Sequence, residues 1–186
     1  MNETMPVSAE EILEFWFAPE VKKRWFNATP EFDQLMLEQF LVTYQAAAAG
    51  ELDHWVESPR SCLALLIVLD QFPLNMFRGT PQAFATETQA QRISKEAVVK
   101  GLDRGMSKEY KIFMYMPLMH SEDIRDQELS VSLFESAGLP DNLKWARHHR
   151  DIVKRFGRFP HRNAILGRES TMAEQAYLAS KEAFSG

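Results

Sequence analysis

The stretch SPRSCLALLIVLDQFP, residues 58–73, decides the fold of this chain. Ser58 and Pro59 are typical of a helix start, and the run from Cys62 to Leu69 contains eight apolar residues in succession. Such a run is too short to cross a bilayer and is apolar on every face, so we expect it to form the central, buried helix. We expect this helix to end at Asp70. A carboxylate at the negative end of a helix dipole needs a neutralising partner, so Asp70 predicts a nearby arginine or a bound proton.

On the N-terminal side of this stretch, caps and apolar spacing predict two more helices. Ser8 and Glu11 form a capping box, and the helix that they start closes before Pro19. Thr29, with a proline directly after it, starts a long amphipathic helix that ends at Gly50. The tryptophans and phenylalanines of this part are expected in the core, because aromatic side chains bury a large apolar area.

On the C-terminal side, helix start and stop signals follow one another closely. The predicted helices run from Phe84 to Gly101, from Ser107 to Met116, from Ser121 to Gly138 and from Pro140 to Gly157, and a last one starts at the capping box of Thr171 and Glu174. The boundary at Met116 follows from Pro117, because a proline disfavours helix in the residue before it.

These signals together predict an all-α fold. About seven helices joined by short loops favour antiparallel helical hairpins, and the length of the chain favours a single domain over residues 1–186. In the helix before Gly157, the residues Trp145, His149, Ile152 and Phe156 form a stripe at helical spacing. We therefore expect His149 to point inward.

Composition and charge exclude several classes of protein. With 45% hydrophobic and 25% charged residues and a formal net charge of −5, the chain is neither disordered nor a general nucleic-acid binder. Cys62 is the only cysteine, so an intrachain disulfide and a site of several thiolates are excluded, and we expect this thiol to pack as a small hydrophobe.

The N-terminal segment is acidic where a signal peptide is basic, and no apolar run spans a membrane. We expect a cytoplasmic protein that binds neither nucleic acid nor membrane.

The stretch RFGRFPHRNAILGR, residues 155–168, concentrates cations in this acidic chain. From Lys144 to Arg168 the sequence has eight lysines or arginines, a single acidic residue, Asp151, and three of the five histidines. Some of these cations belong to a solvated helix face. The glycines and the proline of the stretch, however, impose turns that hold its arginines and His161 in defined directions.

Two interpretations of these arginines stay open at the level of sequence. An arginine fork donates two parallel hydrogen bonds to a carboxylate or a phosphate, so Arg158, Arg162 and Arg168 favour an anion pocket. Alternatively, the same arginines pair inside the protein with Asp70, Glu122 and Glu128. Both interpretations can hold at once.

Histidines and a carboxylate provide candidates for acid–base chemistry. His120, Glu122 and His161 carry the side chains that such chemistry uses. No pair of histidines at i and i+4 places two metal ligands on one helix face, so no metal site is predicted. No serine lies on a strand-to-helix elbow, so a Ser/His/Asp triad is not predicted either.

Three long blocks of the sequence resemble the bacterial family known as domain of unknown function 924. The blocks are LDQFPLNMFRGTPQAFATE (69–87), FMYMPLMHSEDIRDQE (113–128) and HRDIVKRFGRFPHRNAILGRESTMAE (149–174). The resemblance implies an all-helical fold similar to the tetratricopeptide-like superhelix, which the periodicity of the sequence does not by itself demonstrate. It brings no established activity, and any cofactor stays unknown.

The polar positions of that family's blocks correspond to particular residues here. They are Asp70, Gln71, Asn75, Arg78, His120, Glu122, Gln127, Arg158, His161, Arg162, Asn163 and Arg168. The first block usually reads DQFPRN, whereas this chain has Leu74 in place of the arginine, which weakens any role for a cation at that point.

We therefore expect a pocket for a small anionic metabolite where the central helix end, the His120 turn and the 155–168 loop converge. Asp70 and Glu122 would orient Arg78, Arg158 and Arg162, and the proton-transfer candidates in a hydrolase-like step are His120, Glu122 and His161. The full set of ligand-binding candidates is Asp70, Gln71, Asn75, Arg78, His149, Arg158, Arg162, Asn163 and Arg168.

The alternative function is a protein-interaction scaffold. Folds of helical hairpins often present a concave surface to a protein partner, and the polar blocks would then be purely structural. The sequence does not decide whether the protein is an enzyme.

Overall fold

The computed structural model describes residues 5–184. The α-helices are α1 (Ala9–Trp16), α2 (Pro19–Lys22), α3 (Pro30–Ala48), α4 (Pro59–Leu66), α5 (Phe72–Met76), α6 (Glu87–Lys100), α7 (Lys108–Met119), α8 (Ile124–Ser136), α9 (Pro140–Phe156) and α10 (Met172–Leu178). Three 3-10 turns, η1 (Asp53–Glu57), η3 (Pro81–Phe84) and η4 (Pro160–Arg162), and a π turn, η2 (Ile67–Gln71), complete the regular structure. No strand occurs within residues 5–184, so the fold is all-α as predicted.

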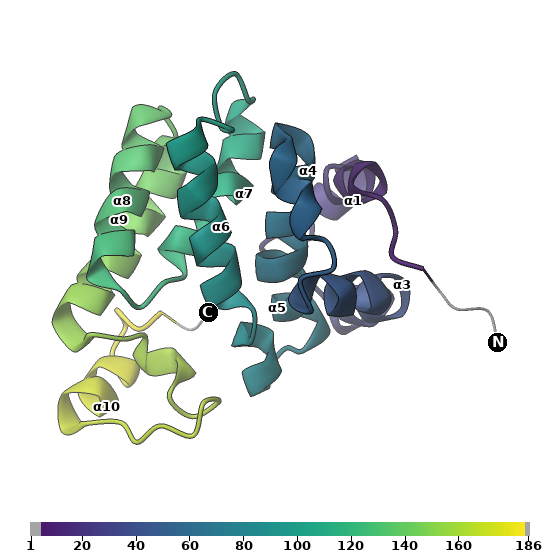
Figure 1. The fold of residues 1–186 in the computed structure, drawn as a ribbon. Coiled ribbons are helices and arrows are strands. Elements are labelled where there is room, and N and C mark those ends of the chain that lie inside the picture. Colours follow the sequence, from purple (N-terminus) through teal and green to yellow (C-terminus); the bar gives the residue numbers. More distant parts are fainter. Residues whose placement is uncertain (1–4, 185–186) are drawn as a thin grey trace.

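Helices that follow one another along the chain lie side by side in space. Figure 1 shows α1 and α3 at one end, α4 and α5 next, then α6 and α7, and finally α8 and α9, with α10 below them. The pairs α6–α7, α7–α8 and α8–α9 are in direct contact. This is an arrangement of helical hairpins; the tetratricopeptide-like geometry and the single-domain organisation stay predictions.

The apolar run within residues 58–73 forms the centre of the core, as predicted. Every side chain from Cys62 to Leu69 is fully buried. Aromatic rings surround the adjoining Phe72, with the ring centroids of Trp16 and Phe40 at 5.7 and 4.9 Å from its own. The prediction that the N-terminal aromatics are core residues is wrong for Phe26, whose side chain is 74% exposed.

The central helix does not end at Asp70, so that prediction is wrong. It passes through the π turn η2, where the N–H of Phe72 donates to the carbonyl of Ile67, and continues into α5. Pro73 has no N–H to offer the carbonyl of Leu69, four residues earlier. The buried hydroxyl of Thr86 donates to that carbonyl instead (2.6 Å), which lets the helix run through the proline. Asp70 therefore lies within a helix and not at its negative end.

Helix α7 likewise continues past Pro117, against the prediction that it stops at Met116. All side chains from Phe113 to Met119 are buried in the core, and this burial outweighs the lost backbone hydrogen bond. Ser94 on α6 donates to the carbonyl of Met114 (2.6 Å), one of the carbonyls in the turn before the proline.

Two further local predictions are corrected. Asp123, not Ser121, caps α8: its carboxylate accepts the N–H of Arg125 (2.8 Å), while the hydroxyl of Ser121 accepts the N–H of Asp123 (3.1 Å). Trp145 is 50% exposed, because the buried face of α9 is centred on Ala146 and His149 and not on the stripe that begins at Trp145.

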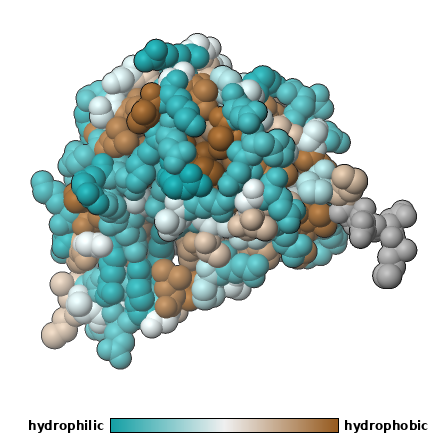
Figure 2. Space-filling view, viewed as in Figure 1, coloured by the Kyte–Doolittle hydropathy of each residue, from teal (hydrophilic) through white to brown (hydrophobic). Residues whose placement is uncertain are grey.

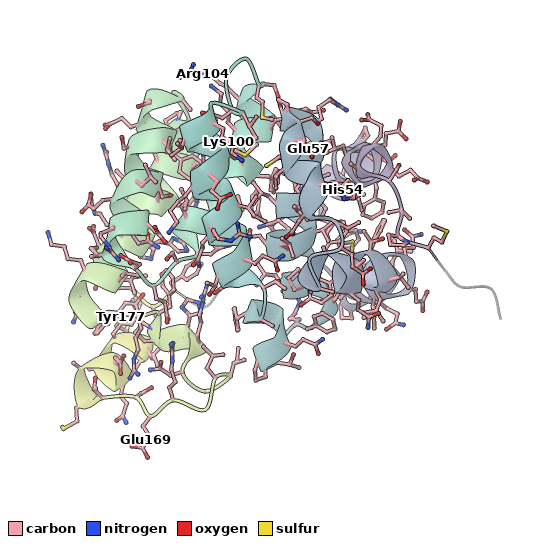
Figure 3. All side chains as sticks on the ribbon, in the orientation of Figure 1. His54, Glu57, Lys100, Arg104, Glu169 and Tyr177 are labelled. Atoms are coloured by element: carbon pink, nitrogen blue, oxygen red, sulfur yellow. The ribbon has the colours of Figure 1, made fainter. Side chains whose placement is uncertain are left out.

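A second, smaller apolar cluster lies beyond the main core. It contains Ile152 and Val153 of α9, Phe159 and Tyr177, with Phe156 and Phe184 packed against it. Figure 3 places Tyr177 on α10 near the end of α9, and the centroids of its ring and that of Phe156 are 5.1 Å apart. The 155–168 stretch thus contributes Phe156 and Phe159 to this second cluster.

The surface is mixed in character. Figure 2 shows hydrophilic residues over most of one face, with apolar patches between them. Among the helices within residues 5–184, none combines the length and the apolar character needed to cross a membrane.

Candidate functional site

Four charged or titratable side chains from distant parts of the chain meet between the main core and the second cluster. They are Asp70 on η2, Glu87 at the start of α6, His120 at the C-cap of α7 and Arg162 on η4. We call this group the polar cluster. His120 Nδ1 lies 2.8 Å from Asp70 Oδ1, and Arg162 Nη1 donates to Glu87 Oε2 at 2.9 Å.

Asp70 is fixed by its own neighbour as well as by His120. The amide of Gln71 donates to Asp70 Oδ2 at 2.6 Å and also contacts the sulfur of Met116 at 3.2 Å. Each carboxylate oxygen of this buried aspartate therefore has a partner. The π turn that carries both residues widens the helix where their side chains leave it, and π turns are frequent at functional sites.

His120 is held on two sides. Gln127 on α8 donates to the carbonyls of Met119 and Ser121 at 2.8 and 2.6 Å, so it clamps the backbone directly before and after the histidine. With Nδ1–H donated to Asp70, Nε2 offers a lone pair when the ring is neutral and an N–H when it is charged, and Nε2 has no hydrogen-bond partner among residues 5–184. The side chain of His120 is 15% exposed, so the ring is not sealed off from solvent.

The pKa of His120 reflects opposing effects. Burial of the ring lowers the pKa, but the neighbouring carboxylates of Asp70 and Glu87 together raise it above the ordinary value for histidine. Burial also raises the pKa of Glu87, helped by Asp70 and opposed by Arg162 and His120, to about 7. Two groups whose pKa values are both raised by their surroundings therefore lie in one cluster, which suits general acid–base chemistry.

Arg162 is the most confined cation of the cluster. Its side chain is 7% exposed, and its guanidinium carbon lies 4.7 Å from the ring centroids of both Phe84 and Phe159. Its Nε and the Oε1 of Glu87 are buried, and neither atom has a hydrogen-bond partner among the described residues. The Arg162–Glu87 pair is therefore only partly satisfied.

The other predicted ligand-binding arginines are engaged more completely. Arg168 donates to both carboxylate oxygens of Glu122 (2.7 and 2.9 Å), and Glu122 Oε1 also accepts the N–H of Phe159 (2.7 Å). Burial raises the pKa of Glu122, but Arg168 and the Phe159 N–H outweigh that effect and hold it below the ordinary value. Arg168 Nε donates to Asn163 Oδ1 (3.0 Å). These bonds tie the 155–168 stretch to the turn after α7.

Arg158 lies outside the polar cluster. It donates to both oxygens of Glu174 (2.7 and 2.9 Å), the residue that forms the capping box of α10 with Thr171. The prediction that Arg158 pairs with Asp70, Glu122 or Glu128 is wrong, because the turn at Gly157 directs it toward α10. Glu128 instead lies 3.9 Å from Arg150.

Arg78 and Asn75 are also not brought to the cluster. Arg78 makes a two-bond pair with Asp33 on α3 (2.6 and 3.0 Å), and the amide of Asn75 donates to the carbonyl of Gln71 (3.0 Å). The expectation that Asp70 and Glu122 orient Arg78 is therefore wrong. Asn75 belongs to the support of the π turn and not to the cluster itself.

His149 and His161 form an aromatic group beside the cluster. The ring centroid of His149 lies 4.6 Å from that of Phe184 and 5.5 Å from that of Phe159. The ring centroid of His161 lies 5.1 Å from that of Phe184 and 5.6 Å from that of Phe159. His149 Nδ1–H donates to the carbonyl of Trp145 (2.8 Å), as expected for an inward histidine. Burial lowers the pKa of His149 to about 3 and that of His161 to about 4, so both rings are neutral at pH 7. Neither makes a hydrogen bond to His120 within the described part of the chain.

Metal ligands and surface grooves are two further features that can mark a site. Among residues 5–184, no three His, Cys, Asp or Glu side chains are placed to hold a metal ion. A surface groove of about 300 Å³ between α9 and α10, lined by His148, Asp151 and Tyr177 among others, contains none of the polar cluster.

Comparison with known proteins gives the chain its family. Residues 12–182 match the family model described as "Bacterial protein of unknown function (DUF924)". The chain belongs to this family. The DUF924 chain is similar to a solved structure titled "Structure of Protein of Unknown Function ATU0120 from Agrobacterium tumefaciens", with 43% identity and a TM-score of 0.85 over 92% of this chain and 96% of that one. No curated protein matches the DUF924 chain.

Sequence reasoning did not predict the roles of two residues at this site. Glu87, the partner of Arg162, lies 75 residues from it in the chain, and no local pattern connects the two. Gln127 was found only through the family resemblance, and its clamp on the His120 turn becomes visible only when α8 packs beside α7.

Proposed function

We propose that this protein binds a small oxyanion-bearing metabolite at Arg162 and that His120, oriented by Asp70, transfers a proton to or from it. The observation that carries this proposal is the pairing of an oriented imidazole with a partly satisfied arginine in one buried cluster. An aspartate that accepts a hydrogen bond from one N–H of an imidazole fixes the orientation of the ring and leaves the other ring nitrogen to act as the base. The reaction class that fits is a hydrolytic or other acid–base step.

The arginine would recognise a carboxylate or a phosphate group. Guanidinium donors in a buried site bind such groups in two-point geometry, and the rings of Phe84 and Phe159 hold the plane of Arg162. Gln127 would act as a positioning residue, since it fixes the backbone on both sides of His120.

A ligand screen tests the proposal. Thermal unfolding of the purified protein is measured with a panel of small carboxylates and phosphate esters, and at least one compound should raise the unfolding temperature. The variants His120→Gln and Arg162→Lys should lose most of that shift, whereas His54→Gln, which removes an exposed histidine on η1, should keep it. If every stabilising compound acts equally on the Arg162→Lys variant, the proposed site is wrong.

The alternative function, an interaction scaffold with structural polar blocks, has one observation in its favour. Arg78, Arg158 and Arg168 are each paired with a carboxylate of the same chain, which is what a structural network requires. The two functions differ in what Arg162→Lys does. If the protein is a scaffold, Arg162→Lys should lower the stability of the protein and leave its response to small ligands unchanged. The folded variant should then still bind the protein partner with the affinity of the wild type.

A further inference from the structure

The arginines near the site differ in how they hold their carboxylates. Arg78, Arg158 and Arg168 each donate two hydrogen bonds to the two oxygens of one carboxylate. Arg162, the most buried of them, donates one hydrogen bond to Glu87, through Nη1 alone. Two parallel hydrogen bonds are the strong form of an arginine–carboxylate pair. Arg162, whose burial is the most unfavourable of the four, therefore has the weakest carboxylate pairing.

The incomplete match leaves donors and acceptors without partners. Arg162 Nε and Glu87 Oε1 are both buried and have no partner among residues 5–184. A buried polar atom without a partner is unfavourable, and the guanidinium of Arg162 lies against the rings of Phe84 and Phe159. An oxyanion placed beside Nε would give Arg162 the two-point partner that Glu87 does not.

We propose that the bound oxyanion replaces the carboxylate of Glu87 as the partner of Arg162, and that Glu87 takes up one proton from solvent as it leaves. This inference rests on the proposed function. In the free protein the carboxylate of Glu87 is the acidic partner of Arg162. Protonation of Glu87 removes one negative charge beside Arg162, and a bound anion supplies it again.

The groups that face Glu87 come from three other elements. They are Asp70 from η2, His120 from α7 and Arg162 from η4. Because the pKa of Glu87 is about 7, the free-energy change on protonating its carboxylate at neutral pH is small. A carboxylate with an ordinary pKa would resist the same exchange, because protonating it at pH 7 is far less favourable.

Sulfate is a suitable probe because it does not titrate between pH 6 and pH 8. Its affinity is measured from chemical-shift changes in two-dimensional NMR spectra at constant ionic strength. Linkage with a group of pKa about 7 predicts that the apparent affinity of the wild-type protein falls about tenfold from pH 6 to pH 8. Protonation of His120 acts with the same sign, since a positively charged ring favours the anion.

Three variants separate the contributions. Glu87→Gln imitates the protonated carboxyl, so it should bind sulfate at pH 8 about as well as the wild type does at pH 6, with most of the pH dependence gone. Glu96→Gln, an exposed carboxylate of the same helix paired with Arg92, should behave as the wild type. Arg162→Lys should weaken binding at every pH while the spectrum shows a folded protein.

Each outcome decides between the two proposals. If the wild type binds sulfate with equal affinity at pH 6 and pH 8, or if Glu87→Gln shows the same tenfold fall, the exchange at Glu87 is wrong while the site at Arg162 stands. If neither the wild type nor Glu87→Gln binds, or if Arg162→Lys binds equally well and sulfate is an adventitious ion only, both the exchange and the proposed site are wrong.

Discussion

Lowering the pH from 8 to 5 tests the burial of His149. This side chain is 6% exposed, and burial lowers its pKa from 6.5 to about 3. Between these two pH values the unfolded chain binds nearly one more proton at this residue, while the folded protein keeps the ring neutral. The free energy of unfolding therefore falls as the pH is lowered, and the linkage amounts to about 2 kcal/mol for this histidine at pH 5.

The sign and size follow from the environment of the ring. His149 gives its Nδ1–H to the Trp145 carbonyl, a neutral acceptor, and lies against the rings of Phe159 and Phe184. His120 and His161 further disfavour a positive charge there. A group with a lowered folded pKa stabilises fully above its unfolded pKa, and this contribution is lost as the pH falls below 6.5.

Urea unfolding of the wild type and His149→Gln at a series of pH values measures the effect. The difference in unfolding free energy between the two proteins should change by about 2 kcal/mol from pH 8 to pH 5, with the wild type losing more. The comparison is needed because Glu87 changes stability in the opposite direction over the same range. A His54→Gln control, in which the lost ring is solvent-exposed, should show no such change. Parallel curves for wild type and His149→Gln, or an NMR titration of His149 near pH 6.5, would refute the reasoning.

Three other predictions concern the same part of the molecule. Asp70→Asn should lower the pKa of His120, measured by NMR titration, because one of the two carboxylates that raise it is lost; an unchanged midpoint contradicts the pairing. Thr86→Val should destabilise the protein by about 1–3 kcal/mol in urea unfolding, since it leaves the Leu69 carbonyl without its donor, while Thr86→Ser should be close to wild type. Glu87→Gln should gain stability relative to wild type by about 3 kcal/mol from pH 4.5 to pH 8, because a carboxyl whose folded pKa is raised to about 7 loses stability as the pH rises through that interval; equal slopes would argue against the buried carboxylate.

The sequence by itself determined the helices whose signals are local. The capping boxes of Ser8 with Glu11 and of Thr171 with Glu174 both form, and the left-handed Gly157 ends α9 at φ 72°. Such signals act across three or four residues, so they do not depend on what packs nearby. The buried run from Cys62 to Leu69 was equally readable, since a segment that is apolar on every face has no stable place at a surface.

Only the tertiary structure decided where these helices continue and which charges meet. Local rules predict that a helix stops before Pro73 and before Pro117. The helix nevertheless continues at Pro73, where the hydroxyl of Thr86 bonds the Leu69 carbonyl, and at Pro117, where the side chains of α7 are buried. The partner of Arg162 is Glu87, because the docking of η4 against α6 brings together residues far apart in sequence. Charge pairing depends on distances between elements that no local pattern encodes, and for that reason the sequence supplied the candidates while packing selected the cluster.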